Sequence, residues 1–288
     1  MLKLSVITDE FSQDFRRVIA FAREFDLQGL EIRSVWDTPV EKLTLEQIHE
    51  MRNLLAGTEL VICSIASPFL KCDIDDHQQI GEHVRMLGRC IEIAEHLGCD
   101  IVRTFTFWKN GSLNDRLDRI VEIYQRALFL AMRTGVRLAV ENEDSTTVGT
   151  GEELAALIER LDSPLVRACW DPQNDFYRTG GTRDYRPGYA AVRAHTIHVH
   201  LKDARVNPDS GQVENEILGQ GGVNVQGQIE GLVRDGYRGF VSLETHWRPA
   251  SVPARSEDVD VSRFADVAEY ATWLCMRNLR SMVEGATS

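Results

Sequence analysis

An alternation of short apolar, β-branched runs with longer amphipathic helical patterns constrains the fold more than any other feature of this sequence. The runs typical of strands cover residues 2–8, 29–33, 59–67, 100–105, 137–141, 166–171, 196–202 and 239–244. The helical patterns that follow them cover about 14–25, 44–56, 76–97, 114–134, 150–161, 184–194, 225–235 and 259–284. Strict strand–helix alternation favours a parallel sheet, and eight repeats favour its closure. Since no GxGxxG fingerprint follows the first strand, the sequence predicts an α/β fold of the (β/α)8 TIM-barrel type rather than an open, doubly wound sheet.

Signals at the helix ends agree with this division and place the chain, residues 1–288, in a single domain. Glycines stand where predicted helices end and strands follow, at Gly98, Gly135 and Gly236. Asn114 and Thr150 are expected to cap the amino ends of two helices. The strands and helices of the barrel take up residues 1–250, and the apolar pattern over about 258–285 predicts a final helix that closes the barrel.

Composition and charge bear on partners and location. The formal net charge of −12 repels phosphate backbones, so nucleic acid is not an expected partner. No apolar run approaches the roughly 20 residues of a membrane span, and acidic residues come too early for a secretory signal, so a cytoplasmic protein without a membrane partner is expected. Cysteines without CxxC spacing are predicted to be reduced core residues; they are Cys63, Cys72, Cys90, Cys99, Cys169 and Cys275. The predicted final helix could also form a subunit interface, so a homo-oligomer remains an alternative to a monomer.

Four consecutive predicted strands end in a side chain that can bind a metal ion. These side chains are Glu141, Asp171, His200 and Glu244. Apolar residues alternate with Glu141, His200 and Glu244 along their strands, so these three should face the barrel axis while their apolar neighbours face the helices. Three carboxylates and one imidazole suit one divalent metal ion, expected to be Mn²⁺, with Mg²⁺, Co²⁺ or Zn²⁺ as alternatives. Such an ion would also relieve the repulsion between the carboxylates.

Each of these residues has a plainer interpretation when it is taken alone. A glutamate at a strand end is often a solvated loop residue, and Asp171 before a proline is a common helix cap. His198 and His200 could be core histidines bonded to neighbouring carboxylates. Four coincidences in phase on neighbouring strands favour a metal site over these separate explanations.

Further residues near the strand ends are candidates for binding a substrate. They are Arg103, Trp108, Asn174, His198, Lys202 and Arg205. Arg103 could bind a carboxylate or a phosphate, or form a salt bridge inside the barrel. Lys202 could form a Schiff base, although a charge-positioning role beside Asp203 suits it better. Trp108 could cover the face of a sugar or pack in the core. The glycine-rich segment 219–222 could cradle a phosphate or make a simple turn.

The strand-end residues stand in longer motifs, namely Val140-Glu141-Asn142, Trp170-Asp171-Pro172-Gln173-Asn174, His198-Val199-His200-Leu201-Lys202-Asp203, Leu218-Gly219-Gln220-Gly221-Gly222 and Leu243-Glu244. Through these motifs, over roughly residues 1–250, the chain resembles the xylose-isomerase-like TIM-barrel superfamily, often labelled sugar phosphate isomerase/epimerase. That group includes ketose 3-epimerases, hydroxypyruvate isomerase, inosose dehydratase, 3-dehydroshikimate dehydratase and endonuclease IV. The resemblance implies that Glu141, Asp171, His200 and Glu244 are the metal ligands. It also implies that Glu141 and Glu244 act as the catalytic acid and base.

The chain departs from two branches of that superfamily. Ketose 3-epimerases have a substrate-binding histidine three residues after the metal-binding aspartate, where this chain has Asn174. They also carry a second glutamate in a sequence context that residues 142–146 do not reproduce. Endonuclease IV is rich in metal-binding histidines, which are missing here from segments 66–68 and 103–105. These departures argue against epimerisation of a free ketose and against DNA repair.

The expected function is that of a divalent-metal-dependent isomerase or epimerase. Its substrate would be a sugar, a keto-sugar or a polyol-derived carbonyl compound, and the reaction would be proton transfer through a metal-bound enediolate. A metal-dependent lyase or dehydratase of the inosose or 3-dehydroshikimate kind is the alternative, because its first proton transfer is the same. A non-catalytic, metal- or ligand-binding barrel is a third interpretation. In the enzymatic interpretations the expected partner is a small carbohydrate-like molecule.

Overall fold

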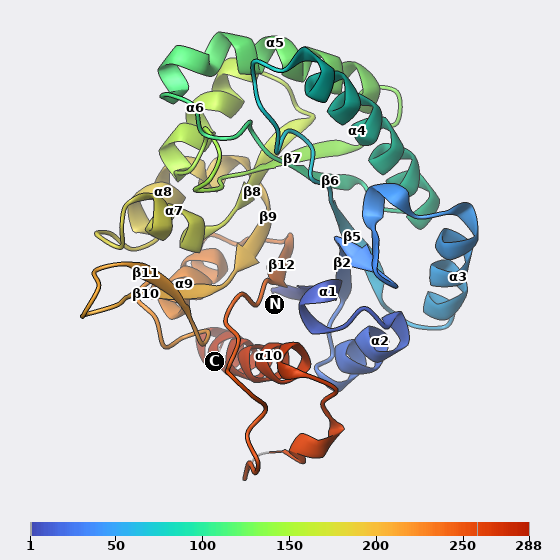
Figure 1. Cartoon of the computed structure of the whole chain (residues 1–288), viewed down its shortest axis with the longest axis vertical. Coiled ribbons are helices and arrows are strands. Elements are labelled where there is room, and N and C mark those ends of the chain that lie inside the picture. The colour runs from blue at the N-terminus through green and yellow to red at the C-terminus, as the bar shows by residue number, and fades with distance from the viewer. Residues whose placement is uncertain (1, 258, 288) are drawn as a thin grey trace.

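The computed structural model describes residues 2–257 and 259–287. Within these residues, eight parallel strands close into a barrel at the centre of the molecule (Figure 1). The barrel strands are β1 (Lys3–Ile7), β2 (Gly29–Ile32), β5 (Val61–Ala66), β6 (Ile101–Thr104), β7 (Arg137–Glu141), β8 (Val166–Trp170), β9 (Thr196–Leu201) and β12 (Phe240–Leu243). Each strand pairs with the next of these along the chain, and β12 pairs with β1 to complete the ring. The predicted (β/α)8 fold is therefore confirmed.

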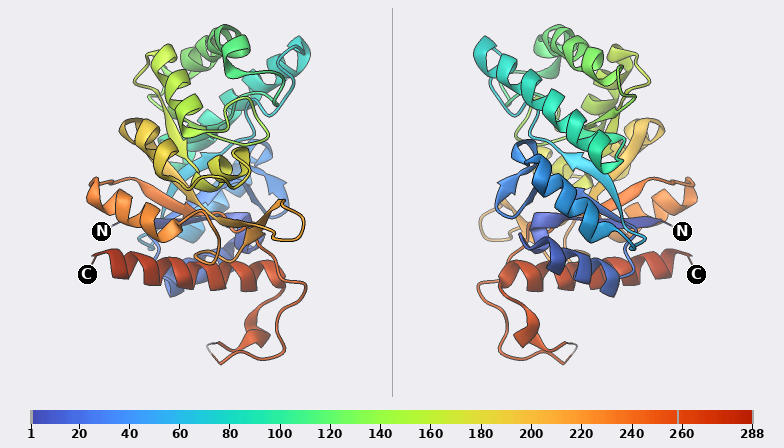
Figure 2. Two further views of the ribbon diagram at one scale, coloured as in Figure 1. Left: turned by 90° about the vertical axis from the view of Figure 1, so that its left-hand side faces the viewer. Right: turned by 90° about the vertical axis from the view of Figure 1, so that its right-hand side faces the viewer.

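Helices surround the barrel on its outside (Figures 1 and 2). They are α2 (Phe15–Glu24), α3 (Leu45–Leu55), α4 (His77–Leu97), α5 (Leu113–Ala131), α6 (Gly151–Leu161), α8 (Arg186–Val192), α9 (Val225–Arg234) and α10 (Val267–Thr287). Helix α10 packs against α9 and against the short α1 (Thr8–Phe11). It therefore covers the place where the last barrel strand, β12, pairs with the first, β1.

Helix α10 begins later than the sequence pattern predicts. Its first residue is Val267 rather than one near 258, and residue 258 itself lies outside the described residues. The Asp266 carboxylate accepts hydrogen bonds from the amides of Ala268 and Glu269, which is how a helix is capped at its amino end. The residues before it form a short 3-10 turn, η3 (Val261–Arg263), on a segment that extends out past α10 (Figure 2). Apolar residues in and beside that turn, namely Val259, Val261 and Phe264, extend the apolar pattern ahead of the helix.

The two predicted helix caps differ in outcome. Thr150 caps α6 in a capping box with Glu153, as expected. The prediction for Asn114 is wrong, because Ser112 caps α5 and forms the box with Asp115. Serine and asparagine are both good caps, but only Ser112 has an acidic residue three positions later to close the reciprocal pair.

Short elements that the sequence pattern does not predict follow several strands at their carboxyl ends. They are α1, α7 (Pro172–Arg178), η1 (Val40–Lys42), the hairpin β3 (Ser34–Val35) with β4 (Thr38–Pro39), and the hairpin β10 (Asp203–Val206) with β11 (Val213–Glu216). η2 (Arg193–His195) precedes β9. Because the carboxyl ends of parallel strands meet at one end of a barrel, the elements that follow strands build up its mouth.

The core has an apolar outer layer and a polar interior. Outward-facing strand residues such as Val140, Val199 and Leu243 are buried against the helices. Inside the barrel, a small apolar cluster of Ile101, Ala139 and Cys169 lies apart from that layer. Other interior positions hold polar side chains that are fully buried, namely Ser5, Glu31, Ser64, His198, His200 and Ser242. Most of these polar groups are joined by hydrogen bonds, whereas Ser64 Oγ and the Nδ1 atoms of His198 and His200 have no partner among the described residues.

Two expectations concern the cysteines and the membrane. The six cysteines are buried and none forms a disulfide, as predicted. Among the described residues, no helix combines the length and the apolar character that crossing a bilayer requires.

Candidate metal centre

Side chains from the ends of four neighbouring strands meet at the mouth of the barrel. One ligand atom from each of Glu141, Asp171, His200 and Glu244 can be chosen so that all of them lie within 4.8 Å of one another. All four side chains are buried. The structure thus brings together the four predicted strand-end residues, and the spacing suits coordination of a single ion.

One ring nitrogen of His200, Nδ1, faces this cluster without a hydrogen-bond partner among the described residues. This Nδ1 lies 3.3 Å from Glu141 Oε1 and 3.5 Å from Glu244 Oε2. A buried polar atom without a partner needs an explanation. In its neutral form, an imidazole nitrogen that faces two carboxylates can bind a divalent cation, so the residues fit a metal ion.

Asp171 is both a helix cap and a member of the cluster. Its Oδ1 accepts hydrogen bonds from the amides of Gln173 at 2.8 Å and Asn174 at 3.1 Å, which fixes the start of α7. Its Oδ2 is bonded to the ammonium of Lys202. Burial, together with the nearby Glu141 and Glu244, raises the pKa of Asp171 to about 6 despite that ammonium. Asp171 can therefore cap α7 and bind a metal ion at the same time. A further cation nearby would stabilise the ionised form of its carboxylate.

Lys202 is buried between two carboxylates. Its Nζ donates to Asp171 Oδ2 and to Glu244 Oε2. Burial alone would lower the pKa of Lys202, but these two carboxylates outweigh it and hold the pKa well above the usual range. A permanently protonated amine is not a nucleophile, so this geometry supports a charge-positioning role over a Schiff base. The predicted partner is wrong, because Asp203 is bonded to the amides of Gly219 and Gly221 instead.

The two glutamates are each held by a pair of neighbours. Glu141 Oε1 accepts a hydrogen bond from Asn174 Nδ2 at 3.1 Å, and its Oε2 lies 3.3 Å from Arg103 Nε. Glu244 is bonded through Oε2 to Lys202 and through Oε1 to Arg33 at 3.0 Å. Each carboxylate is therefore fixed in direction before any ligand binds.

A cleft of about 440 Å³ opens next to the cluster. Its lining includes Glu141 and Glu244 together with Arg103, Phe105, Lys71 and His246. The guanidinium of Arg103 stacks on the Phe105 ring at 4.0 Å, and the ammonium of Lys71 lies 4.1 Å from the same ring. The cleft thus combines carboxylates, cations and one aromatic face, which are the groups that bind polyhydroxy molecules; besides the residues above, its lining includes Arg33, Glu41 and Glu143.

Five of the six substrate-binding candidates lie outside the lining of the cleft. His198 is fully buried beneath His200, and Trp108 is largely exposed on a loop. Arg205 lies on the β10–β11 hairpin, where it pairs with Glu214 and Glu216. Of the others, Arg103 lines the cleft, while Asn174 and Lys202 contact the cluster itself.

The glycine-rich segment 219–222 folds around Asp203. The Asp203 carboxylate accepts hydrogen bonds from the amides of Gly219 and Gly221, both at 2.9 Å. A Cβ on Gly221 would lie 2.2 Å from Asp203 Oδ1, so only glycine fits there. These amides are used inside the protein, which favours the turn over the phosphate cradle.

Comparison with known proteins agrees with the fold and the order of these elements. The sequence pattern that defines the xylose isomerase-like TIM barrel matches residues 19–265. The chain therefore belongs to the xylose isomerase-like TIM-barrel family.

Solved structures with the same fold superpose on nearly the whole chain. The 3-keto-D-glucoside 4-epimerase YcjR of E. coli is 17% identical, with a TM-score of 0.69 over 96% of this chain and 100% of that one. A xylose isomerase-like TIM-barrel protein from Mycobacterium smegmatis, in complex with magnesium, is 18% identical, with a TM-score of 0.66 over 98% of this chain and 97% of that one. The probable 3-DHS dehydratase AsbF of Bacillus anthracis is 18% identical, with a TM-score of 0.72 over 96% of this chain and 98% of that one. At these identities the likeness shows the fold. A search of curated protein sequences gave no significant match.

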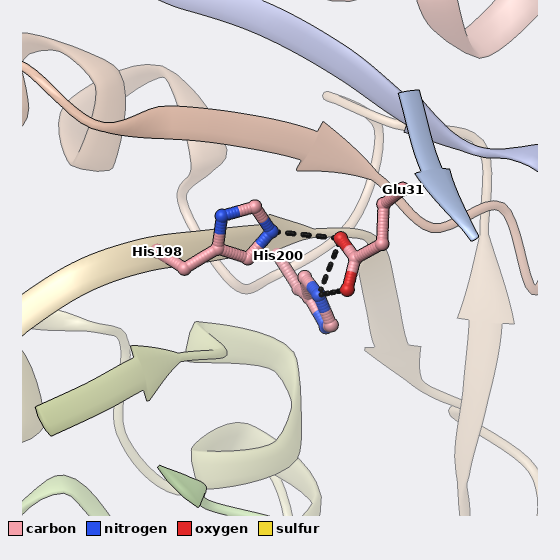
Figure 3. A group of neighbouring side chains, drawn as sticks. All are labelled: Glu31, His198 and His200. Atoms are coloured by element: carbon pink, nitrogen blue, oxygen red, sulfur yellow. Dashed lines mark hydrogen bonds and ion pairs between the residues drawn. The ribbon is translucent and has the colours of Figure 1, made fainter. Parts of the chain in front are cut away.

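Sequence reasoning missed a residue on the far side of this xylose isomerase-like barrel. Glu31 on β2 is fully buried, and its carboxylate lies between the rings of His198 and His200 (Figure 3). Arg33, two residues later, was also missed although it binds Glu244. One signal was available, since Glu31 is a charged residue between two apolar ones in a strand that reads as buried.

Proposed function

We propose that this chain is a divalent-metal-dependent isomerase or epimerase acting on a sugar, a keto-sugar or a polyol-derived carbonyl compound. The observation that carries the proposal is the buried cluster of three carboxylates and one imidazole, with the unpartnered His200 Nδ1 aimed at Glu141 and Glu244. The cluster adjoins a cleft large enough for a small carbohydrate-like molecule. A structural relative with the same fold is an epimerase, and another binds magnesium.

Glu141, Asp171, His200 and Glu244 would hold one ion. The mixture of oxygen and nitrogen donors suits Mn²⁺ best, with Mg²⁺, Co²⁺ and Zn²⁺ as alternatives. When bound, the ion would supply Lewis acidity that polarises a substrate carbonyl. Six unpaired, buried cysteines are the reason for placing the enzyme in a reducing compartment, the cytoplasm.

The two glutamates would carry out the proton transfers. A substrate in the cleft meets Glu141 on one side, backed by Asn174 and Arg103, and Glu244 on the other, backed by Lys202 and Arg33. One carboxylate would take the proton from the carbon next to the carbonyl, and the other would return a proton to the opposite face or to the neighbouring carbon. Hydrogen bonds that fix both carboxylates keep them in reach of the same carbon.

Two more residues would orient the substrate. Arg103 and Lys71 line the cleft with their charged ends over the Phe105 ring, and each is paired with a cleft carboxylate, Glu141 and Glu143 respectively. Their remaining N–H groups would bind substrate oxygens. The apolar face of a sugar ring would pack on the part of the Phe105 ring that the two cations do not cover.

A dehydration is the second reaction that this site supports. The observation that favours it is the set of three cations that line the cleft, Arg33, Lys71 and Arg103, which suits a substrate with a carboxylate group. A structural relative with the same fold is a probable dehydratase. Loss of water from a keto-polyol or a dehydroshikimate-like ring creates a conjugated product, so a new ultraviolet absorption band would separate a lyase from an isomerase.

Metal content is the first test of the proposal. Protein purified without added metal, or soaked with Mn²⁺ and desalted, should contain about one ion per chain by elemental analysis, and His200→Ala should lose it. His195→Ala is the matched control, since His195 lies before β9 in η2 and away from the cluster. Absence of metal from the wild type after soaking would reject the four-ligand site.

Proton exchange tests the catalytic step. Metal-loaded enzyme in D₂O should incorporate deuterium next to the carbonyl of a keto-sugar or a polyol-derived ketone, as read by NMR over a panel of such compounds. Glu141→Gln should abolish the exchange while Glu269→Gln, a buried glutamate on α10 paired with Arg17, should not. Exchange that survives in Glu141→Gln would remove this residue from the mechanism.

A further inference from the structure

The structure assigns to Glu31 the role of a positioning residue for the metal centre. We propose that its carboxylate fixes the orientation and the tautomer of His200, so that Nδ1 rather than Nε2 is the atom offered to the ion. This inference rests on the metal site of the proposed function. It concerns a residue on β2, on an arc of the barrel outside the four strands that supply the ligands.

The carboxylate of Glu31 is shared by two imidazoles. His198 Nε2 lies 2.7 Å from Glu31 Oε2, and His200 Nε2 lies 3.1 Å from the same oxygen and 3.2 Å from Oε1. Figure 3 shows the carboxylate reaching from β2 to both rings, which stand on β9. The rings are nearly perpendicular, at 85° with centroids 5.3 Å apart. All three side chains are fully buried, so water does not compete for these bonds.

An ionised carboxylate can only accept hydrogen bonds. Each Nε2 that faces Glu31 must therefore carry a hydrogen, and a neutral His200 then has its lone pair on Nδ1. Nδ1 is the atom that faces Glu141 and Glu244 and that lacks a partner. Glu31 thus selects the tautomer that can bind an ion on the cleft side, and it holds the ring so that the lone pair points there.

Glu31 is itself held in place by a chain of hydrogen bonds deeper in the barrel, through His198, Ser242 and Ser5. His198 Nε2 lies 3.1 Å from Ser242 Oγ, and that hydroxyl is bonded to Ser5 Oγ at 2.7 Å. The chain of contacts runs from Ser5 on β1 through Ser242 on β12 and His198 on β9 to Glu31 on β2. In this arrangement His198 acts on the site through Glu31 and does not touch a substrate.

Replacing Glu31 by glutamine tests the role with almost no change of shape. The amide oxygen in place of Oε2 can still accept from both imidazoles, but it carries no charge, and the amide nitrogen in place of Oε1 cannot accept from His200 Nε2. Both hydrogen bonds become weaker, so the His200 ring and its tautomer are held less firmly. We expect Glu31→Gln to bind Mn²⁺ about 10- to 100-fold more weakly than the wild type in calorimetric titrations, which is the usual effect of removing such a partner.

Glu269→Gln is the matched control for this substitution. Glu269 is also a buried glutamate in a charged contact, with Arg17, but it lies on α10 away from the metal centre. It should lower the melting temperature and leave Mn²⁺ affinity unchanged. If Glu31→Gln binds Mn²⁺ as tightly as Glu269→Gln does, the positioning role is wrong while the metal site stands. If the wild type binds no ion, both the role and the proposed function are wrong.

A spectroscopic measurement on the wild type keeps the inference testable even if Glu31→Gln does not fold. In long-range ¹H–¹⁵N spectra of Zn²⁺-loaded protein labelled at histidine, the His200 signals can be identified by their loss in His200→Ala. We expect Nδ1 to carry the shift of a metal-bound nitrogen and Nε2 that of a protonated, hydrogen-bonded one. A metal-bound Nε2, or an Nε2 without its hydrogen, would overturn the assignment.

Discussion

Asn142 clamps the backbone of Asp171 with two hydrogen bonds. Its Nδ2 donates to the Asp171 carbonyl oxygen at 2.8 Å, and its Oδ1 accepts from the Asp171 amide at 2.9 Å. The two residues directly follow the neighbouring strands β7 and β8. The Asn142 side chain therefore takes the place of backbone hydrogen bonds where these strands separate. This clamp sets the distance between Glu141, which precedes Asn142, and the Asp171 carboxylate.

We expect Asn142→Asp to damage the metal centre although it keeps the shape of the side chain. A carboxylate can accept from the Asp171 amide but cannot donate to its carbonyl, and it adds a negative charge beside two others. Leaving a buried carbonyl without its donor should lower stability by about 1–3 kcal/mol. Chemical denaturation and Mn²⁺ titration measure the two effects, and an unchanged Mn²⁺ affinity would show that the clamp does not shape the site.

Added metal should stabilise the folded protein. An ion that binds only the native state at a concentration of about 100 times its dissociation constant adds roughly 2.7 kcal/mol. The melting temperature should therefore rise with Mn²⁺ in the wild type and in His195→Ala, but not in His200→Ala. An equal rise in all three proteins would point to binding somewhere other than the strand ends.

Lys202→Met should make the protein depend on metal for its stability. The substitution removes the ammonium between Asp171 and Glu244 and leaves two buried carboxylates facing each other. Breaking a buried charge pair in this way is expected to destabilise the metal-free protein by about 3–5 kcal/mol. Saturating Mn²⁺ should recover a large part of that loss, because the ion supplies positive charge at the same place.

Denaturation with and without Mn²⁺ measures this difference. A loss of stability that is equal in both conditions would mean that Lys202 acts by packing and not by its charge.

The thiols should be inert while the protein is folded. Burial raises the pKa of Cys72, Cys90 and Cys99 to about 12. The thiolate is the reactive form, and raising the pKa lowers its share, so at pH 8 only about one thiol in ten thousand is ionised. A disulfide reagent that releases a coloured thiolate should report almost no reaction in buffer at pH 8 and six thiols per chain in denaturant. Fast reaction of the native protein would contradict the burial of these residues.

Local patterns were enough to predict the barrel and the four strand-end residues. Alternation along a strand decides which side chains face inward, and parallel strands bring their carboxyl ends together, so Glu141, Asp171, His200 and Glu244 follow from rules that act within a few residues. The hairpin of β10 and β11 was not predicted, because most of its residues are polar or partly exposed and show no clear alternation of apolar and polar side chains.

Glu31 and Arg33 could not be assigned for a different reason. Glu31 meets His198 at a separation of 167 residues, and Arg33 meets Glu244 at 211. Their partners depend on barrel closure and on which side chains reach across its interior. No pattern near β2 contains that information, so the supporting half of the site required the structure.

The sharing of Glu31 between two imidazoles has a consequence for fragments of this protein. Residues 137–244 contain all four candidate ligands and the strands that carry them. A half-barrel cut from the second part of the chain would keep every atom that touches the ion, yet it would lack Glu31, Arg33 and the β1 strand that joins β12 to β2. Its imidazole would be free to rotate and to exchange its hydrogen between the two nitrogens. We therefore expect tight binding of an ion only by the closed barrel, in which β1 joins β12 to β2.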